Sequence, residues 1–324
     1  MQRVKAFDWL RGLAVLVMLQ THSMPLLKPE LRSGWWHQFV NRIDGLVAPA
    51  FLLTAGFALA LVSARASDRA TRLKQLKRIG QVGLLAITIN AIWFPISREP
   101  QWLFRMDILH CMALSLLLLW SVLWLTQKPA VFVVISFTLF LVAPFAERIG
   151  EPLNWLLNTS STAQFPLMPW AAYVFGGAAF GLVTARQGSL NRWLVGAAVM
   201  GAAFWWLRPV LQPLYGQHDF WVSNISSCGH RWACVAVIAL VFRALERRVT
   251  AIKPLEFFST NSLSAYFVHE MLLFLWWPFS FERMWKGQLS WPEMLSAVVL
   301  LMALTALVLW VFERVQQKLQ PRPT

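Results

Sequence analysis

The chain has 324 residues, of which 57% are hydrophobic and 14% are charged, with a formal net charge of +14. Soluble domains carry about 25% charged residues, so this composition excludes an ordinary soluble protein, a disordered chain and a coiled coil. The three cysteines exclude a disulfide framework, and none stands at a spacing typical of a metal site. Because the basic residues alternate with long apolar runs, we interpret the chain as a membrane protein that does not bind nucleic acid.

About ten apolar stretches are long enough to cross a bilayer as helices, which takes about 20 residues each. They are expected near residues 7–27, 44–63, 78–96, 106–126, 129–146, 166–185, 192–211, 228–245, 256–278 and 292–313. No repeat, low-complexity linker or soluble segment separates them. The sequence therefore predicts an all-α fold, a polytopic membrane helix bundle of about ten transmembrane helices that forms one domain over residues 1–324.

The distribution of lysine and arginine predicts the orientation of these helices. Basic residues concentrate in the loops after the second and eighth stretches and in the C-terminal tail. The positive-inside rule places these segments, and with them both termini, in the cytoplasm. The first stretch contains Asp8 and Arg11 and ends without a small-residue cleavage site, so we expect it to be retained. Without a recognisable secretory extension, we expect a bacterial inner membrane.

This orientation places all six histidines toward the outer side: His22, His37, His110, His218, His230 and His269. The acidic residues Asp44, Asp107 and Glu270 share that half. Ionisable side chains at membrane depth are costly and usually face a protein-lined or water-filled interior. Histidine is also the usual proton carrier near neutral pH. A satisfied interfacial histidine is the simpler explanation of each one alone, but the six together indicate a functional cavity.

Tryptophan is also more frequent on the predicted outer side than on the inner side, and Trp36 is one example. Aromatic belts are expected at both interfaces, so the imbalance needs a further explanation. Aromatic faces stack on the apolar faces of sugar rings. The pattern favours an outer opening that faces carbohydrate.

Arg11 and His22 stand eleven residues apart in the first predicted helix. This spacing is a rise of about 16 Å and lies within roughly 20° of three full turns, so both side chains share one face. Arginine at the inner end can bind phosphate, and histidine at the outer end can take a proton or carry an acyl group. Acyl-CoA combines a phosphate-rich head with a reactive group at that reach. The structural alternative for Arg11 is an i,i+3 ion pair with Asp8 at the interface.

The segment Asp8-Trp-Leu-Arg11-Gly-Leu, followed by His22, resembles the first helix of the transmembrane acyltransferase superfamily. Bacterial O-acyltransferases of that superfamily carry Arg-x10-His at this place. The closest resemblance is to the heparan-α-glucosaminide N-acetyltransferase catalytic-domain family. Residues 44–56 are similar to the second-helix motif of that family, and residues 105–110 to its fourth-helix opening.

A further motif lies near the end of the chain. The segment Asn261-Ser-Leu-Ser-Ala-Tyr266-Phe-Val-His269-Glu270 is similar to the Asn-Ser-x3-Tyr-x2-His-Glu segment of the same family. The resemblance extends from residue 3 to about residue 281. It implies transfer of an acetyl or acyl group from cytosolic acetyl-CoA, as co-substrate and without a metal, across the lipid bilayer. The acceptor would be a hydroxyl or amine of an extracytoplasmic glycan or glycolipid.

The resemblance also suggests roles for individual residues. In the lysosomal enzyme of this family, Asn occupies the position of His22, and the active histidine lies in the following luminal loop, where this chain has His37. His22 is our first candidate for the base or transient acyl carrier, and His37 is the second. The supporting catalytic candidates are Asp107, His110, His269 and Glu270. The candidates for binding acetyl-CoA are Asp8, Arg11, Lys77 and Arg78, and those for the acceptor are Trp36, Asp44, Asn261 and Tyr266.

The alternative function is a secondary transporter or flippase for a glycan or lipid-linked precursor. About ten spans with polar residues at depth also fit a transporter. The sequence, however, shows neither a two-half repeat nor a matching pair of interrupted helices. Release of CoA on addition of acetyl-CoA would favour the enzyme, and accumulation of substrate without acyl transfer would favour the transporter.

Overall fold

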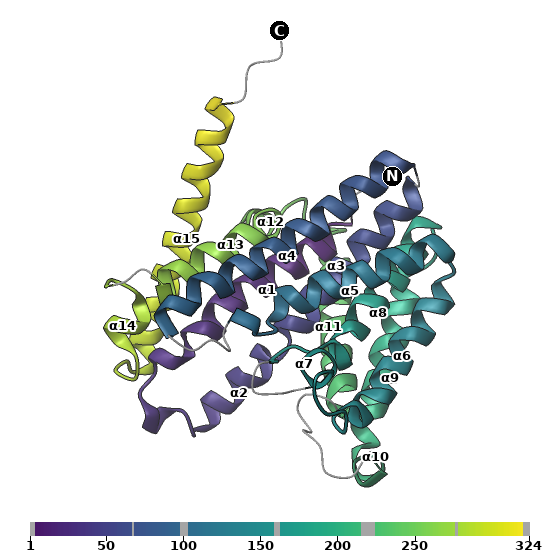
Figure 1. Ribbon diagram of the computed structural model, residues 1–324, viewed down its shortest axis with the longest axis horizontal. Helices are drawn as coiled ribbons and strands as arrows, with labels where there is room; N and C mark the ends of the chain where they lie inside the picture. Colours follow the sequence, from purple (N-terminus) through teal and green to yellow (C-terminus); the bar gives the residue numbers. More distant parts are fainter. Residues whose placement is uncertain are drawn as a thin grey trace. The chain divides into compact units, whose positions relative to one another are not determined.

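The computed structural model describes residues 4–66, 68–97, 103–158, 163–214, 224–275 and 278–319. These residues form helices, and β-type pairing within them is limited to isolated bridges between Leu27 and Leu289 and between Met106 and Ala163 (Figure 1). The predicted all-α fold class is confirmed. The chain divides into two compact units: unit 1 consists of residues 1–4, 8–47 and 249–324, and unit 2 of residues 5–7 and 48–248. A single domain over the whole chain stays a prediction.

Unit 1 combines segments from both ends of the sequence. Its elements are α1 (Lys5–Ser23, from Asp8 onward), the short 3-10 helices Met24–Leu26 and Pro29–Leu31, α2 (Trp35–Asp44), α12 (Lys253–Thr260), α13 (Ser262–Glu270), a π-helical segment (Met271–Leu275), α14 (Phe281–Trp285) and α15 (Trp291–Leu319). The α1 helix ends before the predicted limit of residue 27 because Pro25 has no N–H to continue the hydrogen-bond ladder. A small core of Met24, Leu27, Met294 and Val298 packs the end of this segment against α15.

Within unit 1, α1 lies beside α12 and α13. Trp9 Nε1 donates to Glu256 Oε1 at 3.0 Å, and a Cβ placed on Gly12 would lie 2.0 Å from the carbonyl oxygen of Leu255. Further along α1, His22 meets His269. Because the partners advance in the same direction along both segments, α1 and α12–α13 run parallel. Parallel packing agrees with the predicted topology, in which the first and ninth spans both run outward.

The ninth predicted span, residues 256–278, is not one continuous helix. Pro254 stands in the first turn of α12, which ends at Thr260, and Asn261 (φ −99°, ψ 18°) separates it from α13. The amide of Asn261 donates to the carbonyl of Phe257 at 3.2 Å and to Glu313 Oε1 of α15 at 2.8 Å. The apolar pattern continues across this break, so hydropathy alone does not reveal it.

Unit 2 contains the middle of the chain. Its helices are α3 (Val47–Arg65, from Ala48 onward), α4 (Arg69–Ser97), α5 (Ile108–Leu125), α6 (Pro129–Ala146), α7 (Asn154–Leu157), α8 (Leu167–Ala185), α9 (Leu190–Trp206), α10 (Arg208–Leu214) and α11 (Ile225–Leu245). The most buried of its candidate spans is α8. A Cβ on Gly177 would lie 2.0 Å from the carbonyl oxygen of Leu53, so the backbones of α8 and α3 touch where glycine permits it.

Six stretches of the described residues are long and apolar enough to cross a membrane, so the chain is an integral membrane protein. They are Trp35–Arg65, Ile108–Leu125, Pro129–Ala146, Leu167–Ala185, Ile225–Leu245 and Trp291–Lys318. Of the other predicted spans, α9 has only 17 residues and the ninth is divided at Asn261. The count of about ten spans and the cytoplasmic location of both termini stay predictions.

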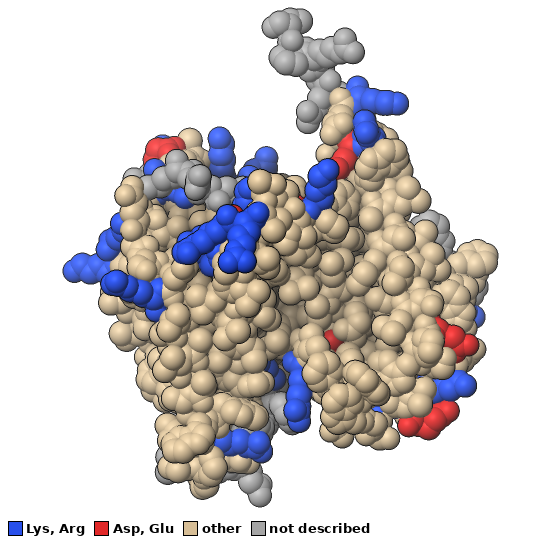
Figure 2. All heavy atoms as spheres, turned by 180° about the vertical axis from the view of Figure 1, so that it is seen from behind, with Lys and Arg blue, Asp and Glu red and all other residues tan. Residues whose placement is uncertain are grey.

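The surface agrees with a bilayer environment. Most of the face in Figure 2 carries neither acidic nor basic side chains, and lysines and arginines gather in separate groups. Large apolar side chains are exposed: Leu125 is 86% accessible and Trp206 is 80% accessible. Contact with lipid accounts for this exposure, which would be unfavourable in water.

Candidate functional site

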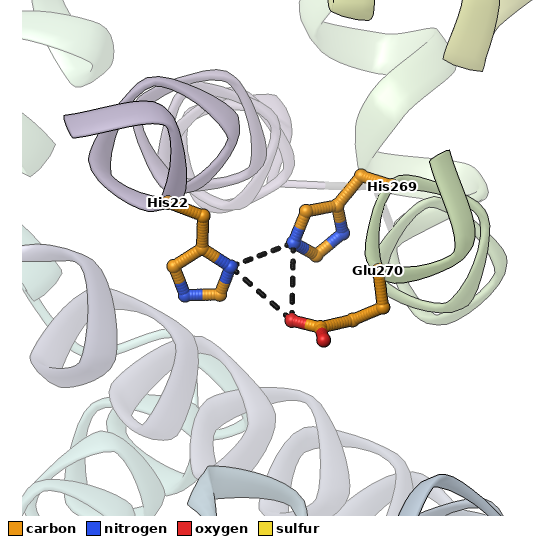
Figure 3. Close-up of side chains that lie close together, drawn as sticks. All are labelled: His22, His269 and Glu270. Carbon is orange, nitrogen blue, oxygen red and sulfur yellow. Dashed lines mark hydrogen bonds and ion pairs between the residues drawn. The ribbon is translucent and has the colours of Figure 1, made fainter. Parts of the chain in front are cut away.

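Three of the predicted catalytic side chains meet in unit 1 (Figure 3). The last turn of α1 presents His22, and the last turn of α13 presents His269 and Glu270. His22 Nδ1 lies 2.8 Å from His269 Nε2 and 3.3 Å from Glu270 Oε1, and His269 Nε2 lies 3.5 Å from the same carboxylate oxygen. We call these three residues the His–His–Glu cluster. Its nitrogen and oxygen atoms can exchange a proton, and they could also ligate a metal ion.

The hydrogen bonds indicate where the protons of the cluster lie. His269 Nδ1 is 3.0 Å from the carbonyl oxygen of Ala265, which can only accept, so Nδ1 donates and Nε2 carries the lone pair. The proton between the two rings then belongs to His22 Nδ1, which donates to His269 Nε2. Neutral His22 consequently carries its own lone pair on Nε2, the ring nitrogen that points away from His269 and Glu270 in Figure 3.

The cluster is more accessible on the side of His22. His269 is fully buried and Glu270 is 6% accessible, whereas the side chain of His22 is 32% accessible. The ring of Tyr266 packs edge-on against His269 with the centroids 5.4 Å apart, and Phe274 lies 6.1 Å from the His22 ring. Packing therefore fixes His269 in place, while the side chain of His22 is partly accessible.

Asp44, at the end of α2, belongs to the surroundings of the cluster. Both of its carboxylate oxygens are buried. The side chain lies beside Gln20 and Thr21 of α1 and interacts electrostatically with His22. A second carboxylate thus stands near the accessible histidine.

Arg11 contacts α12, the helix that directly precedes the α13 helix contacted by His22. Its Nε donates to Ser259 Oγ of α12 at 3.0 Å, and its Nη2 lies 3.2 Å from Asp8 Oδ1. Both Arg11 and His22 therefore face α12–α13, as their spacing predicts. The i,i+3 pair with Asp8, the structural alternative for Arg11, is also present.

The other candidates of unit 1 lie apart from the cluster in their described contacts. His37, on α2, is bonded to the Asn41 amide at 3.1 Å. Trp36 is 60% accessible and belongs to an aromatic group with Trp35 and Phe39. Asn261 bridges α12 and α15 through the hydrogen bonds described above.

Unit 2 holds the remaining candidates. Asp107 caps α5, because its carboxylate accepts from the Ile108 N–H at 2.7 Å. His110 follows in the first turn of α5, and its Nδ1 is buried without a hydrogen-bond partner among the described residues. Lys77 and Arg78 are exposed on α4. His218 lies outside the described residues.

The sequence reasoning missed Ser259 and Glu256, the α12 partners of Arg11 and Trp9. A serine and a glutamate in an amphipathic turn carry no motif. Only the pairing of the first helix with a segment almost 250 residues later would have revealed them.

These features define a class of protein: an integral membrane protein with a partly buried histidine–carboxylate cluster where two parallel helices meet. The chain belongs to the heparan-alpha-glucosaminide N-acetyltransferase, catalytic, family, which matches residues 3–221. This finding confirms the family resemblance and makes the chain a member of a transmembrane acetyltransferase family. The matched range includes Arg11 and His22 but ends before α13, so His269 and Glu270 lie beyond it. No curated protein matches the chain in sequence.

Proposed function

We propose that the chain transfers an acetyl group from cytosolic acetyl-CoA to a hydroxyl or amine of an extracytoplasmic glycan, with His22 as the catalytic residue. The observation that carries this proposal is the hydrogen-bonded His22 ring. Its Nδ1 is held by His269 and Glu270, and its Nε2 points away from them as an acceptor. A histidine that is oriented through one ring nitrogen and carries its lone pair on the other is the usual arrangement of a general base.

In the proposed reaction, His22 Nε2 takes the proton of the acceptor hydroxyl or amine. The acceptor oxygen or nitrogen then forms a bond to the thioester carbonyl carbon, and the carbon–sulfur bond breaks. The CoA thiolate leaves and receives the proton from His22. While His22 carries two protons, the nearby carboxylate of Glu270 stabilises its positive charge, and His269 Nε2 accepts the Nδ1 proton.

A variant of this path makes His22 a transient acyl carrier. In that case Nε2 attacks the thioester itself, and the acceptor later takes the acetyl group from the ring. Both paths use the same nitrogen and the same orienting partners. A labelled acetyl-protein formed without acceptor would indicate the second path.

The donor site is proposed at the other end of α1. Arg11 lies about three turns and Asp8 about four turns before His22, and the reach from Arg11 fits the distance between a nucleotide phosphate and the thioester of an extended acyl-CoA. Lys77 and Arg78, exposed on α4, are further candidate phosphate ligands. The acceptor candidates are Trp36, Asp44, Asn261 and Tyr266, and Asp107 and His110 are proposed to orient the acceptor. We place the protein in a bacterial inner membrane.

The test is acetyl transfer from radiolabelled acetyl-CoA to glucosamine or a short glucosamine-containing glycan, measured with the full chain in proteoliposomes. His22→Ala should reduce transfer to background, whereas His230→Ala, which alters a histidine of unit 2 beside Cys234, should retain it. The His37→Ala variant shows whether His37, the second candidate, is the catalytic histidine instead of His22. Loss of activity in His37→Ala with full activity in His22→Ala would overturn the role proposed for His22.

A further inference from the structure

The three ligand atoms of the His–His–Glu cluster are spaced as in a zinc site. Nitrogen and oxygen ligands lie about 2.0–2.1 Å from a tetrahedral Zn²⁺ ion and therefore about 3.3 Å from one another. The two distances to Glu270 Oε1 are 3.3 Å from His22 Nδ1 and 3.5 Å from His269 Nε2. The two nitrogens are 2.8 Å apart, so this edge must open by about 0.5 Å. That displacement is within the reach of side-chain rotation.

The protonation of His269 favours metal binding. A histidine ligand commonly donates its second ring N–H to a backbone carbonyl, which fixes the ring and directs the lone pair of the other nitrogen to the ion. His269 has this arrangement, because Nδ1 donates to Ala265 at 3.0 Å and Nε2 faces the cluster. Because His269 is fully buried, the surrounding side chains keep its ring in this orientation.

The local charge also suits a dication. Glu270 contributes one carboxylate directly, and Asp44 contributes a second, whose oxygens are buried and which interacts electrostatically with His22. A dication next to two carboxylates is neutralised, which burial at membrane depth requires. Two imidazoles select Zn²⁺ and similar transition metals over Mg²⁺ and Ca²⁺, which prefer oxygen ligands.

We propose that His22, His269 and Glu270 bind one zinc-type transition metal ion, and that the bound ion inhibits acetyl transfer. Ligation by Nδ1 requires its lone pair, so the proton of neutral His22 moves from Nδ1 to Nε2. The metal-bound form then has no lone pair on Nε2 to take the proton of the acceptor or to attack the thioester. The metal site does not depend on the proposed function, whereas the inhibition rests on it.

The sequence carries no metal-ligand spacing because the ligands come from two helices, 247 residues apart. The separation explains why no local motif predicts the site.

The metal site is tested with the purified full chain in detergent after treatment with a chelator. Co²⁺ serves as the probe, because it replaces Zn²⁺ and its visible absorption reports tetrahedral ligation; bound metal is counted by mass spectrometry. The wild type should bind one ion per chain. Glu270→Gln, which preserves size and shape, should weaken binding by at least about tenfold, and His269→Ala should abolish it.

His230→Ala is the matched control, because it removes a histidine beside a cysteine thiol in unit 2 and should leave Co²⁺ binding unchanged. The thermal stability of each variant in detergent identifies any loss caused by unfolding. Absence of one-to-one binding by the wild type, or equal affinity in Glu270→Gln and wild type, would overturn the metal site.

The inhibition is tested on the same preparations by following transfer of labelled acetyl. Transfer should be full in chelator, fall in proportion to Zn²⁺ occupancy and return when chelator is added again. An equal rate for the metal-loaded protein would overturn the inhibition. Metal binding at the cluster without acetyl transfer in chelator would instead refute the proposed function and leave the metal site standing.

Discussion

His22 Nδ1 lies 2.8 Å from His269 Nε2, so two imidazoles from opposite ends of the chain share one proton. Two rings can approach this closely only when one nitrogen donates and the other accepts. The bond from His269 Nδ1 to Ala265 assigns the acceptor role to His269. His22 is thereby both the oriented and the more accessible ring, and in the proposed reaction His269 is a positioning residue that acts through it.

The carboxylate of Glu270 is expected to contribute to the rate because it faces the His22 ring at 3.3 Å. Glu270→Gln preserves the shape of the side chain but removes the charge that stabilises doubly protonated His22. We expect kcat to fall by about 10²-fold, with little change in KM for acetyl-CoA, in steady-state transfer assays. Glu282→Gln on α14, which removes the ion pair with Lys286, is the control and should leave both constants unchanged. An unchanged kcat in Glu270→Gln would contradict the role of this carboxylate.

Arg11 is expected to bind the phosphates of the donor. Arg11→Ala should raise KM for acetyl-CoA by about tenfold, because a charge-assisted hydrogen bond contributes about 1.5–3 kcal/mol. The same variant should use S-acetyl-N-acetylcysteamine, a thioester without phosphates, as well as the wild type does. Ser259→Ala removes the 3.0 Å bond from Arg11 but keeps the guanidinium charge, so its KM for acetyl-CoA should not change. Equal losses with both donors would assign Arg11 a structural role beside Asp8.

The sequence predicts that Arg11 and His22 lie on one face, because spacing on one helix is a local property. The eleven residues between Arg11 and His22 determine a shared face through helix geometry alone. The structure places both against α12–α13. The membrane character can also be predicted locally, because the length of an apolar run shows whether it can span a bilayer, whichever helices it packs against.

The pairing of distant segments could not be predicted in this way. Neither the contact of Arg11 with Ser259 nor the distance between His22 and His269 follows from a local pattern, because both depend on how α1 packs on α12–α13. The break between α12 and α13 at Asn261 could not be predicted either. It is held by hydrogen bonds from the Asn261 side-chain amide to the Phe257 carbonyl in α12 and to Glu313 in α15. Tertiary hydrogen bonds of this kind leave hydropathy unchanged.

The start of α4 is expected to depend on pH through Asp68. Its carboxylate accepts hydrogen bonds from the Thr71 hydroxyl at 2.7 Å and the Thr71 N–H at 3.0 Å, and these bonds hold the pKa of Asp68 below its ordinary value of 3.8. Because the pKa is lower in the folded chain, the stabilisation is present above about pH 3.8 and is lost as pH falls through the folded pKa.

Hydrogen–deuterium exchange of the first turn of α4, corrected for intrinsic rates, measures this effect. At neutral pH Asp68→Ala should reduce the protection of the Thr71 amide, and the wild type should approach the variant as pH falls below 3.8. Asp68→Asn keeps an acceptor without a titrating charge, so its protection should not vary with pH. A wild type whose protection is constant across this range would refute the capping role.

The contact between α1 and α12 at Gly12 is expected to tolerate no larger side chain. A Cβ on Gly12 would lie 2.0 Å from the carbonyl oxygen of Leu255. This oxygen belongs to the backbone of α12, which cannot move aside as the end of a flexible side chain can. Gly12→Ala must therefore push α12 away, which should cost about 1–3 kcal/mol of stability and lower the melting temperature in detergent. The shift would also separate His22 from His269, so transfer activity should fall with stability. Gly80→Ala on α4, where nothing lies within 4 Å, is the matched control and should be neutral or slightly stabilising. Equal melting temperatures for Gly12→Ala and Gly80→Ala would show that α1 and α12 do not touch at this point.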